Sequence, residues 1–152
     1  ENENYWSFGD SYIKGAWIMH TLRHVIDNDS LWWSILKSFA VENARSHVNT
    51  ADFQRHVEAR TDENFSYFFD QYFLDHRPPK LEYSQDGNKL FYRWADVIPN
   101  FQMPLDVNIN GIEKRIYPTA AVQTLETPEF AVIIFRDWEF LVKVKENSAL
   151  SG

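Results

Sequence analysis

Residues 65–83 read Phe-Ser-Tyr-Phe-Phe-Asp-Gln-Tyr-Phe-Leu-Asp-His-Arg-Pro-Pro-Lys-Leu-Glu-Tyr, and the hydrophobic period changes within this stretch. Its aromatic residues first recur at spacings of three and four, which predicts an amphipathic helix with its apolar face in a core. Pro78-Pro79 ends the helix, because proline lacks an amide hydrogen and disfavours helix in the residue before it. Leu81 and Tyr83 then alternate with polar residues, as in a β-strand. We therefore predict a helical domain over residues 1–78 and a β domain over 79–152.

The sequence before this stretch also indicates helices. Residues 12–26 contain no proline and are apolar on more than one face, which is typical of an interior helix. Asp29 is a plausible N-cap for a second helix, and Thr50 for a third.

The sequence after this stretch indicates a β-sandwich. Asn110-Gly111 is a favoured hairpin turn, and short alternating runs recur up to Val144. About seven short strands at this spacing predict a sandwich. The fold class expected is α+β, with a helical subdomain followed by an antiparallel β-sandwich.

Composition excludes several classes of function. Hydrophobic residues make up 44% of the 152, which permits a sizeable core, and the net charge is −7. An acidic chain without a basic cluster does not suit nucleic-acid binding. No apolar run reaches the roughly 20 residues of a membrane span. There is no cysteine, so disulfides and thiolate chemistry are excluded.

His20 and His24 are spaced i, i+4, which would let two imidazoles share a metal on a helix. A zinc peptidase helix also needs Glu after the first His, and here that position is Thr21. We therefore expect two ordinary helix histidines and no metal ligands in this chain. His47, His56 and His76 are scattered, with no local support for a site.

Residues 12–23, Tyr-Ile-Lys-Gly-Ala-Trp-Ile-Met-His-Thr-Leu-Arg, resemble the Tyr-x-Lys-Gly-Ala-x-x-Leu-His-x-Leu-Arg helix of aminopeptidase N-like zinc metallopeptidases, the gluzincins. Residues 29–39 resemble that family's next helix. The similarity continues in family order with Thr50-Ala51-Asp52-Phe53, Glu58, Phe68-Phe69-Asp70-Gln71-Tyr72-Phe73, His76, Pro79 and Leu81-Glu82-Tyr83. It covers roughly residues 10–84.

The resemblance implies that the chain is the C-terminal end of a thermolysin-like catalytic domain, followed by an immunoglobulin-like β-sandwich. It implies a parent enzyme that uses zinc to remove N-terminal residues from peptides. The family's His-Glu-x-x-His zinc motif and its Gly-x-Met-Glu-Asn amine-binding segment do not occur here. The family's catalytic tyrosine maps onto Tyr12, as a hydrogen-bond donor to the oxyanion. The other interpretation of Tyr12 is an aromatic packed at a helix start.

Further expectations follow from the same resemblance. The chain begins at Glu1 without Met, so we expect a processed or truncated product that lacks the N-terminal part of the catalytic domain, its partner. Lys14 and Gly15 are expected to be structural, with Gly15 allowing a close approach of another element. The helical part is expected to expose an apolar patch and to self-associate. The alternative function is a non-catalytic binding or scaffold protein derived from the peptidase fold. Residue preference and compartment are not encoded in recognisable motifs.

Overall fold

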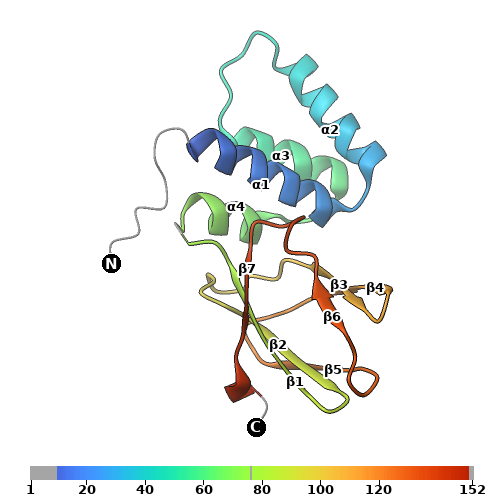
Figure 1. The fold of residues 1–152 in the computed structure, drawn as a ribbon. Helices are drawn as coiled ribbons and strands as arrows, with labels where there is room; N and C mark the ends of the chain where they lie inside the picture. Colours follow the sequence, from blue (N-terminus) through green and yellow to red (C-terminus); the bar gives the residue numbers. More distant parts are fainter. Residues whose placement is uncertain (1–9, 76, 151–152) are drawn as a thin grey trace.

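The computed structural model describes residues 10–75 and 77–150. Four helices come first: α1 (Asp10–Ile26), α2 (Asp29–Glu42), α3 (Thr50–Thr61) and α4 (Ser66–Phe73). Figure 1 shows them stacked at one end of the molecule, with α4 between the other helices and the strands. None of the described helices is both long and apolar enough to cross a lipid bilayer.

Two helix caps lie one residue before the expected positions. Asn28, and not Asp29, caps α2, with its side chain accepting a backbone amide at 2.9 Å. Asn49, and not Thr50, caps α3, and it forms a reciprocal capping box with Asp52. Asparagine is at least as good an N-cap as aspartate and better than threonine, so the asparagine takes the cap in both helices.

Seven strands follow in the described residues, as the alternating pattern predicts. They are β1 (Lys80–Asp86), β2 (Lys89–Ala95), β3 (Leu105–Ile109), β4 (Ile112–Ile116), β5 (Gln123–Glu126), β6 (Ile133–Phe135) and β7 (Lys143–Glu146), with a short 3-10 helix at Ser148–Leu150. They form a sheet of order β5-β2-β1-β7 and a sheet of order β4-β3-β6. The two sheets lie below the helices in Figure 1. The fold is α+β, a helical part followed by a β-sandwich.

The sandwich departs from the expected antiparallel arrangement in one strand pair. Strands β1 and β7 are parallel, with Leu81 beside Val144, whereas the other pairs are antiparallel. A hairpin cannot join a parallel pair, and here residues 87–142, which include the other five strands, lie between β1 and β7. The last part of this connection, residues 136–142, crosses from β6 in the smaller sheet to β7 in the larger one. Phe140, which the alternation places on a strand, lies in this crossover with its side chain fully buried.

One continuous hydrophobic core joins the helices to the sandwich. It includes Leu22 of α1, Phe68 of α4, Leu81 and Trp94 of the larger sheet, and Val107 of the smaller one. Helices end and strands begin where the hydrophobic period changes. The division into domains over 1–78 and 79–152 nevertheless stays a prediction, since a shared core does not separate two folding units.

Two neighbouring side chains of α4 form hydrogen bonds with backbone groups that lie outside helices and strands, where the helical part meets the sandwich. Gln71 is fully buried; its amide nitrogen donates to the Arg77 carbonyl at 3.1 Å, and its oxygen accepts the Ile98 amide at 2.8 Å. The Tyr72 hydroxyl donates to the Leu141 carbonyl at 2.8 Å. These bonds tie α4 to the β1 entry, the β2–β3 loop and the crossover.

We expect Gln71→Leu to lower the free energy of unfolding by roughly 2–4 kcal/mol, because two partly buried backbone groups lose their partner while the side-chain volume is nearly kept. The measurement is urea denaturation followed by tryptophan fluorescence. Gln102→Leu is the control: its side chain is exposed, and the change is expected to stay within about 0.5 kcal/mol. Equal effects of the two variants would contradict a tethering role for Gln71.

Candidate functional site

Tyr12, the predicted catalytic residue, lies near the start of α1 with its side chain 84% exposed. The face it occupies also exposes Ile13, Trp17 and His20. No hydrogen bond joins the Tyr12 hydroxyl to the other residues that the structure describes. Tyr12 is therefore not packed in a core of the described residues, and its catalytic role stays a prediction.

The opposite face of α1 is buried and holds the helix in place. Ile18, Leu22 and Val25 enter the shared core. Thr21 is fully buried; its hydroxyl donates to the Trp17 carbonyl at 2.8 Å and accepts the amide of Leu141 in the crossover at 2.8 Å. Thr21, which follows His20 where a His-Glu-x-x-His motif would have glutamate, therefore links α1 to the sandwich.

Gly15 does not make the close approach expected of it. A Cβ added there would meet no heavy atom within 4 Å among the described residues. In this chain the space beside Gly15 is open, on the part of α1 that also bears Tyr12.

His20 and His24 do not form a metal site with the rest of the described chain. Their rings lie 4.5 Å apart in an edge-to-face arrangement, and His24 turns toward Glu139 and Phe140. No group of three His, Asp or Glu side chains in the described residues is placed to hold a metal ion. His76 lies outside the described residues.

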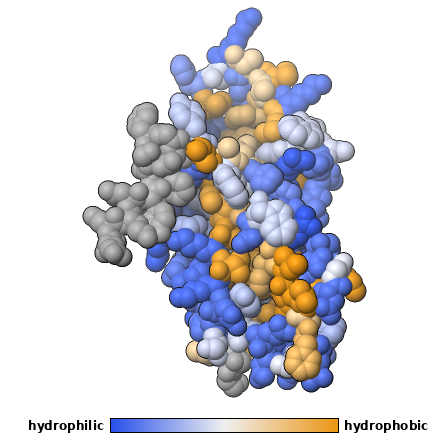
Figure 2. All heavy atoms as spheres, in the orientation of Figure 1, coloured by the Kyte–Doolittle hydropathy of each residue, from blue (hydrophilic) through white to orange (hydrophobic). Residues whose placement is uncertain are grey.

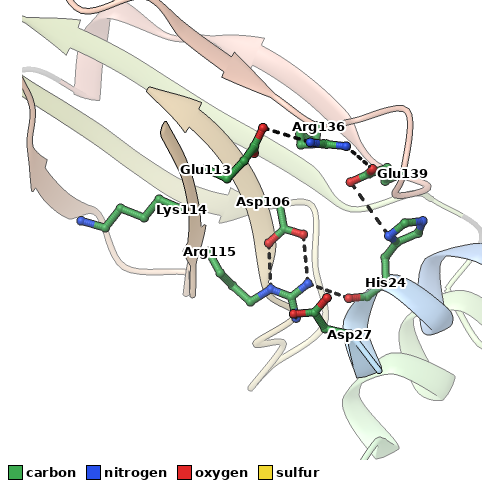
Figure 3. Close-up of a pocket in the computed structure, with 8 residues that line it drawn as sticks. All are labelled: His24, Asp27, Asp106, Glu113, Lys114, Arg115, Arg136 and Glu139. Atoms are coloured by element: carbon green, nitrogen blue, oxygen red, sulfur yellow. Dashed lines mark hydrogen bonds and ion pairs between the residues drawn. The ribbon is translucent and has the colours of Figure 1, made fainter. Parts of the chain in front are cut away.

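A charged cluster fills the cleft between the C-terminal end of α1 and the smaller sheet (Figure 3). It surrounds a cavity of about 370 Å³, and its members are His24, Asp27, Asp106, Glu113, Lys114, Arg115, Arg136 and Glu139. Figure 3 shows Lys114 pointing away from the other side chains. Arg115 and Arg136, which point inward, are each paired with carboxylates. We therefore interpret the cluster as a network of ion pairs and not as a binding site for a charged ligand.

Arg115 makes hydrogen bonds both to the smaller sheet and to the end of α1. It binds both carboxylate oxygens of Asp106, at 2.7 and 2.9 Å, across the β3–β4 hairpin. It also donates to the carbonyls of His24 at 2.6 Å and Val25 at 3.2 Å, which the end of α1 leaves without intrahelical partners. The hydrogen bond to Asp106 is the largest cause of a raised Arg115 pKa. Arg115 therefore fixes the end of α1 on the sandwich.

Arg136 links strand β4 to the crossover through two ion pairs. It bridges Glu113 of β4 at 3.0 Å and Glu139 of the crossover. Glu139 also lies 3.9 Å from Nδ1 of His24. Burial lowers the pKa of His24 from its usual 6.5, and the nearby Glu139 carboxylate only partly opposes this. His24 is therefore neutral at pH 7.

One ion pair of this charged cluster has a signal in the sequence. A two-residue turn at Asn110-Gly111 fixes the hairpin register, and that register places Asp106 opposite Arg115. The contacts of α1 with these strands have no such signal, because they depend on how the helix packs on the sheet.

A second polar cluster, between α2 and α3, has the residue types of a hydrolase triad. Ser38 Oγ lies 2.9 Å from Nε2 of His56, and Glu42 lies 3.6 Å from Nδ1 of His56. However, His56 Nε2 also lies 3.2 Å from the Ile35 carbonyl, which can only accept, so this nitrogen carries the proton. A protonated Nε2 cannot take a proton from Ser38. We therefore interpret this cluster, in which only His56 is buried, as structural.

Comparison with known proteins reveals similarity at the level of structure. No family model matches the chain, and no curated protein sequence matches it. Solved structures do match, among them the crystal structure of Legionella pneumophila aminopeptidase A in complex with aspartic acid, with a TM-score of 0.63 and 15% identity. The match covers 89% of this chain and 18% of that chain. The chain thus shares its fold with part of that structure, and it spans under a fifth of that enzyme's chain.

We expect Arg115→Met to lower the free energy of unfolding by about 2–3 kcal/mol, since charge-assisted bonds to Asp106 and to the end of α1 are lost together. Chemical denaturation measures the change. Arg55→Met is the matched control, because the Arg55 side chain is 71% exposed. A loss no larger than that of the control would show that Arg115 does not hold α1 on the sandwich.

The lowered pKa of His24 predicts a pH dependence. The unfolded chain binds a proton below about pH 6.5 while folded His24 resists it, so stability falls as the pH drops from 7 through the folded pKa. His24→Gln is expected to flatten this part of the stability curve relative to wild type. His47→Gln, at an exposed histidine, is the matched control for the substitution itself. Stability curves of wild type and His24→Gln that run parallel from pH 7 to pH 5.5 would contradict the assignment.

Proposed function

We propose that this chain is the C-terminal end of an aminopeptidase catalytic domain together with the β-sandwich that follows it. The observation that carries the proposal is the likeness to an aminopeptidase over 89% of the chain, which takes in both the helices and the sandwich. The ordered resemblance of residues 10–84 to the aminopeptidase N-like family supports it independently. The parent enzyme would remove N-terminal residues from peptides.

The exposed apolar face of α1 supports the proposal that another part of the catalytic domain packs on this helix. Ile13 is 57% exposed and Trp17 is 38% exposed, next to Tyr12 and the open space beside Gly15. Apolar side chains grouped in this way mark a surface that another part of a protein covers. In the proposed parent, the zinc-binding part of the catalytic domain lies against this face.

Tyr12 is proposed as a catalytic residue of the parent. A neutral phenol is a hydrogen-bond donor at pH 7, and a tetrahedral intermediate of peptide hydrolysis carries an oxyanion. Removal of one donor to such an oxyanion costs about 2.7–4 kcal/mol of barrier. The Tyr12 side chain projects from the uncovered face, where its hydroxyl could reach a group held by another part of the enzyme.

Zinc does not fit the described residues of this chain. His20 and His24 have no third ligand with them, and His24 is engaged with Glu139. We infer that the metal of a complete enzyme is held by ligands outside this chain. The isolated chain is accordingly expected to be inactive on aminoacyl substrates.

In the complete parent enzyme, Tyr12→Phe is expected to lower kcat by roughly a hundred- to a thousandfold, because the lost bond forms to charge that develops in the transition state. KM and metal content are expected to stay near the parental values. Steady-state kinetics on aminoacyl substrates, with metal analysis of each sample, measure this.

Tyr117→Phe provides the matched control for this experiment. Tyr117 is also an exposed tyrosine, 63% exposed, but it follows β4 in the sandwich. It is expected to leave kcat unchanged. If Tyr12→Phe kept the parental kcat with full metal content, Tyr12 would have no catalytic role even in an active aminopeptidase.

A further inference from the structure

The edge strand β6 has an open side. It pairs with β3 through residues 132, 134 and 136, as the bonds from Asn110 to Val132 and from Arg136 to Asp106 show at the two ends. The amides and carbonyls of Ile133 and Phe135 consequently point away from β3. No other described strand pairs with this side of β6. Four backbone groups are therefore available to another strand.

The other sheet edges carry charges and β6 does not. Strand β4 contains Glu-Lys-Arg at 113–115, β5 ends in Glu126, and β7 reads Lys-Val-Lys-Glu. Charged side chains on edge strands prevent pairing with other chains. Strand β6 reads Ile-Ile-Phe. Among the described edges, β6 is the one whose strand residues carry no charge, and Arg136 follows it directly.

The outward face of this edge is apolar. Val132 is 62% exposed and Ile134 is 46% exposed. Just before the strand, Phe130 is 87% exposed and has a φ of 57°, a conformation that a bulky residue rarely adopts. Figure 2 shows hydrophobic side chains gathered over this part of the sandwich, in the lower half of the molecule. Backbone and side chains together present an unprotected strand.

We propose that β6 pairs with β6 of a second copy of this chain, antiparallel about a two-fold axis at Ile134. In this register Ile134 faces Ile134 of the other copy, and Ile133 faces Phe135. Each Ile133–Phe135 pair exchanges both hydrogen bonds, which satisfies the four open groups of each copy. The same patch serves both copies, as a two-fold interface requires.

The charges and the ends of the strand are compatible with this pairing. Val132 lies opposite Arg136 of the other copy, and the Arg136 guanidinium is already neutralised by Glu113 and Glu139 of its own copy. Within the paired residues 132–136, no two like charges lie opposite each other. The two-fold also brings Phe130 to the end of the strand where the other copy has Trp138, which is 52% exposed. This proposal is independent of any peptidase activity.

The register can be tested with a single cysteine, since the chain has none of its own. At a non-hydrogen-bonded antiparallel pair the Cα atoms are about 4.5 Å apart, within the range of a disulfide. Ile134→Cys is expected to form a covalent dimer under mild oxidation at least about ten times faster than Ile112→Cys. Ile112 is 72% exposed on β4 of the same sheet and is the control. Equal rates for the two variants would overturn the proposal.

Sedimentation over a concentration series provides the second measurement. Ile134→Lys, which sets two charges face to face, is expected to weaken dimerisation by at least about tenfold, whereas Ile112→Lys leaves it unchanged. Trp17→Lys tests association through the exposed face of α1 instead. A strictly monomeric wild type, or a dimer lost only in Trp17→Lys, would overturn pairing through β6. Circular dichroism of each variant confirms that it is folded.

Discussion

The arrangement of helices and sandwich depends on how the backbone N–H and C=O of Leu141 are hydrogen-bonded. The amide of Leu141 donates to Thr21 of α1, and its carbonyl accepts the hydroxyl of Tyr72 of α4, each at 2.8 Å. Leu141 lies in the crossover between the two sheets, where no strand neighbour can pair with it. A backbone N–H or C=O that is shielded from water and left without a partner costs about 1–3 kcal/mol, so both helices stabilise the crossover. The same bonds set which face of α1 enters the core.

That constraint explains why the face with Tyr12 is uncovered. With Thr21, Leu22 and Val25 turned toward the sandwich, the opposite face of α1 stays exposed among the residues that the structure describes. The sequence predicts an interior helix because it is apolar on more than one face, and one apolar face is indeed exposed. The two observations agree if α1 is interior in a larger protein. The exposed tyrosine is then a consequence of the missing part.

Much of the fold could be predicted from residue patterns, because periodicity and turn chemistry are local. The spacing of Phe65, Phe68 and Tyr72 gave α4, Pro78-Pro79 gave the change to strands, and Asn110-Gly111 gave the β3–β4 hairpin. The parallel pairing of β1 with β7 could not be predicted, since it depends on where a crossover lands and not on any local pattern. The charged cluster was missed for a related reason. Its members come from α1, β3, β4 and the crossover, and only the Asp106–Arg115 pair is fixed by a turn. The role of Tyr12 rests on resemblance, and no contact within the chain supplies its substrate.

The central claim, that this chain completes the active site of an aminopeptidase through Tyr12, is tested most directly by a crystal structure of the parent enzyme. The ligand would be a peptide analogue whose scissile carbonyl is replaced by a tetrahedral phosphinyl group. We expect the Tyr12 hydroxyl to lie about 2.5–3.0 Å from a phosphinyl oxygen, the distance of a short hydroxyl hydrogen bond. The face of α1 would be covered by the rest of the catalytic domain. A structure in which Tyr12 points to solvent, or in which the ligand binds away from α1, would contradict the account.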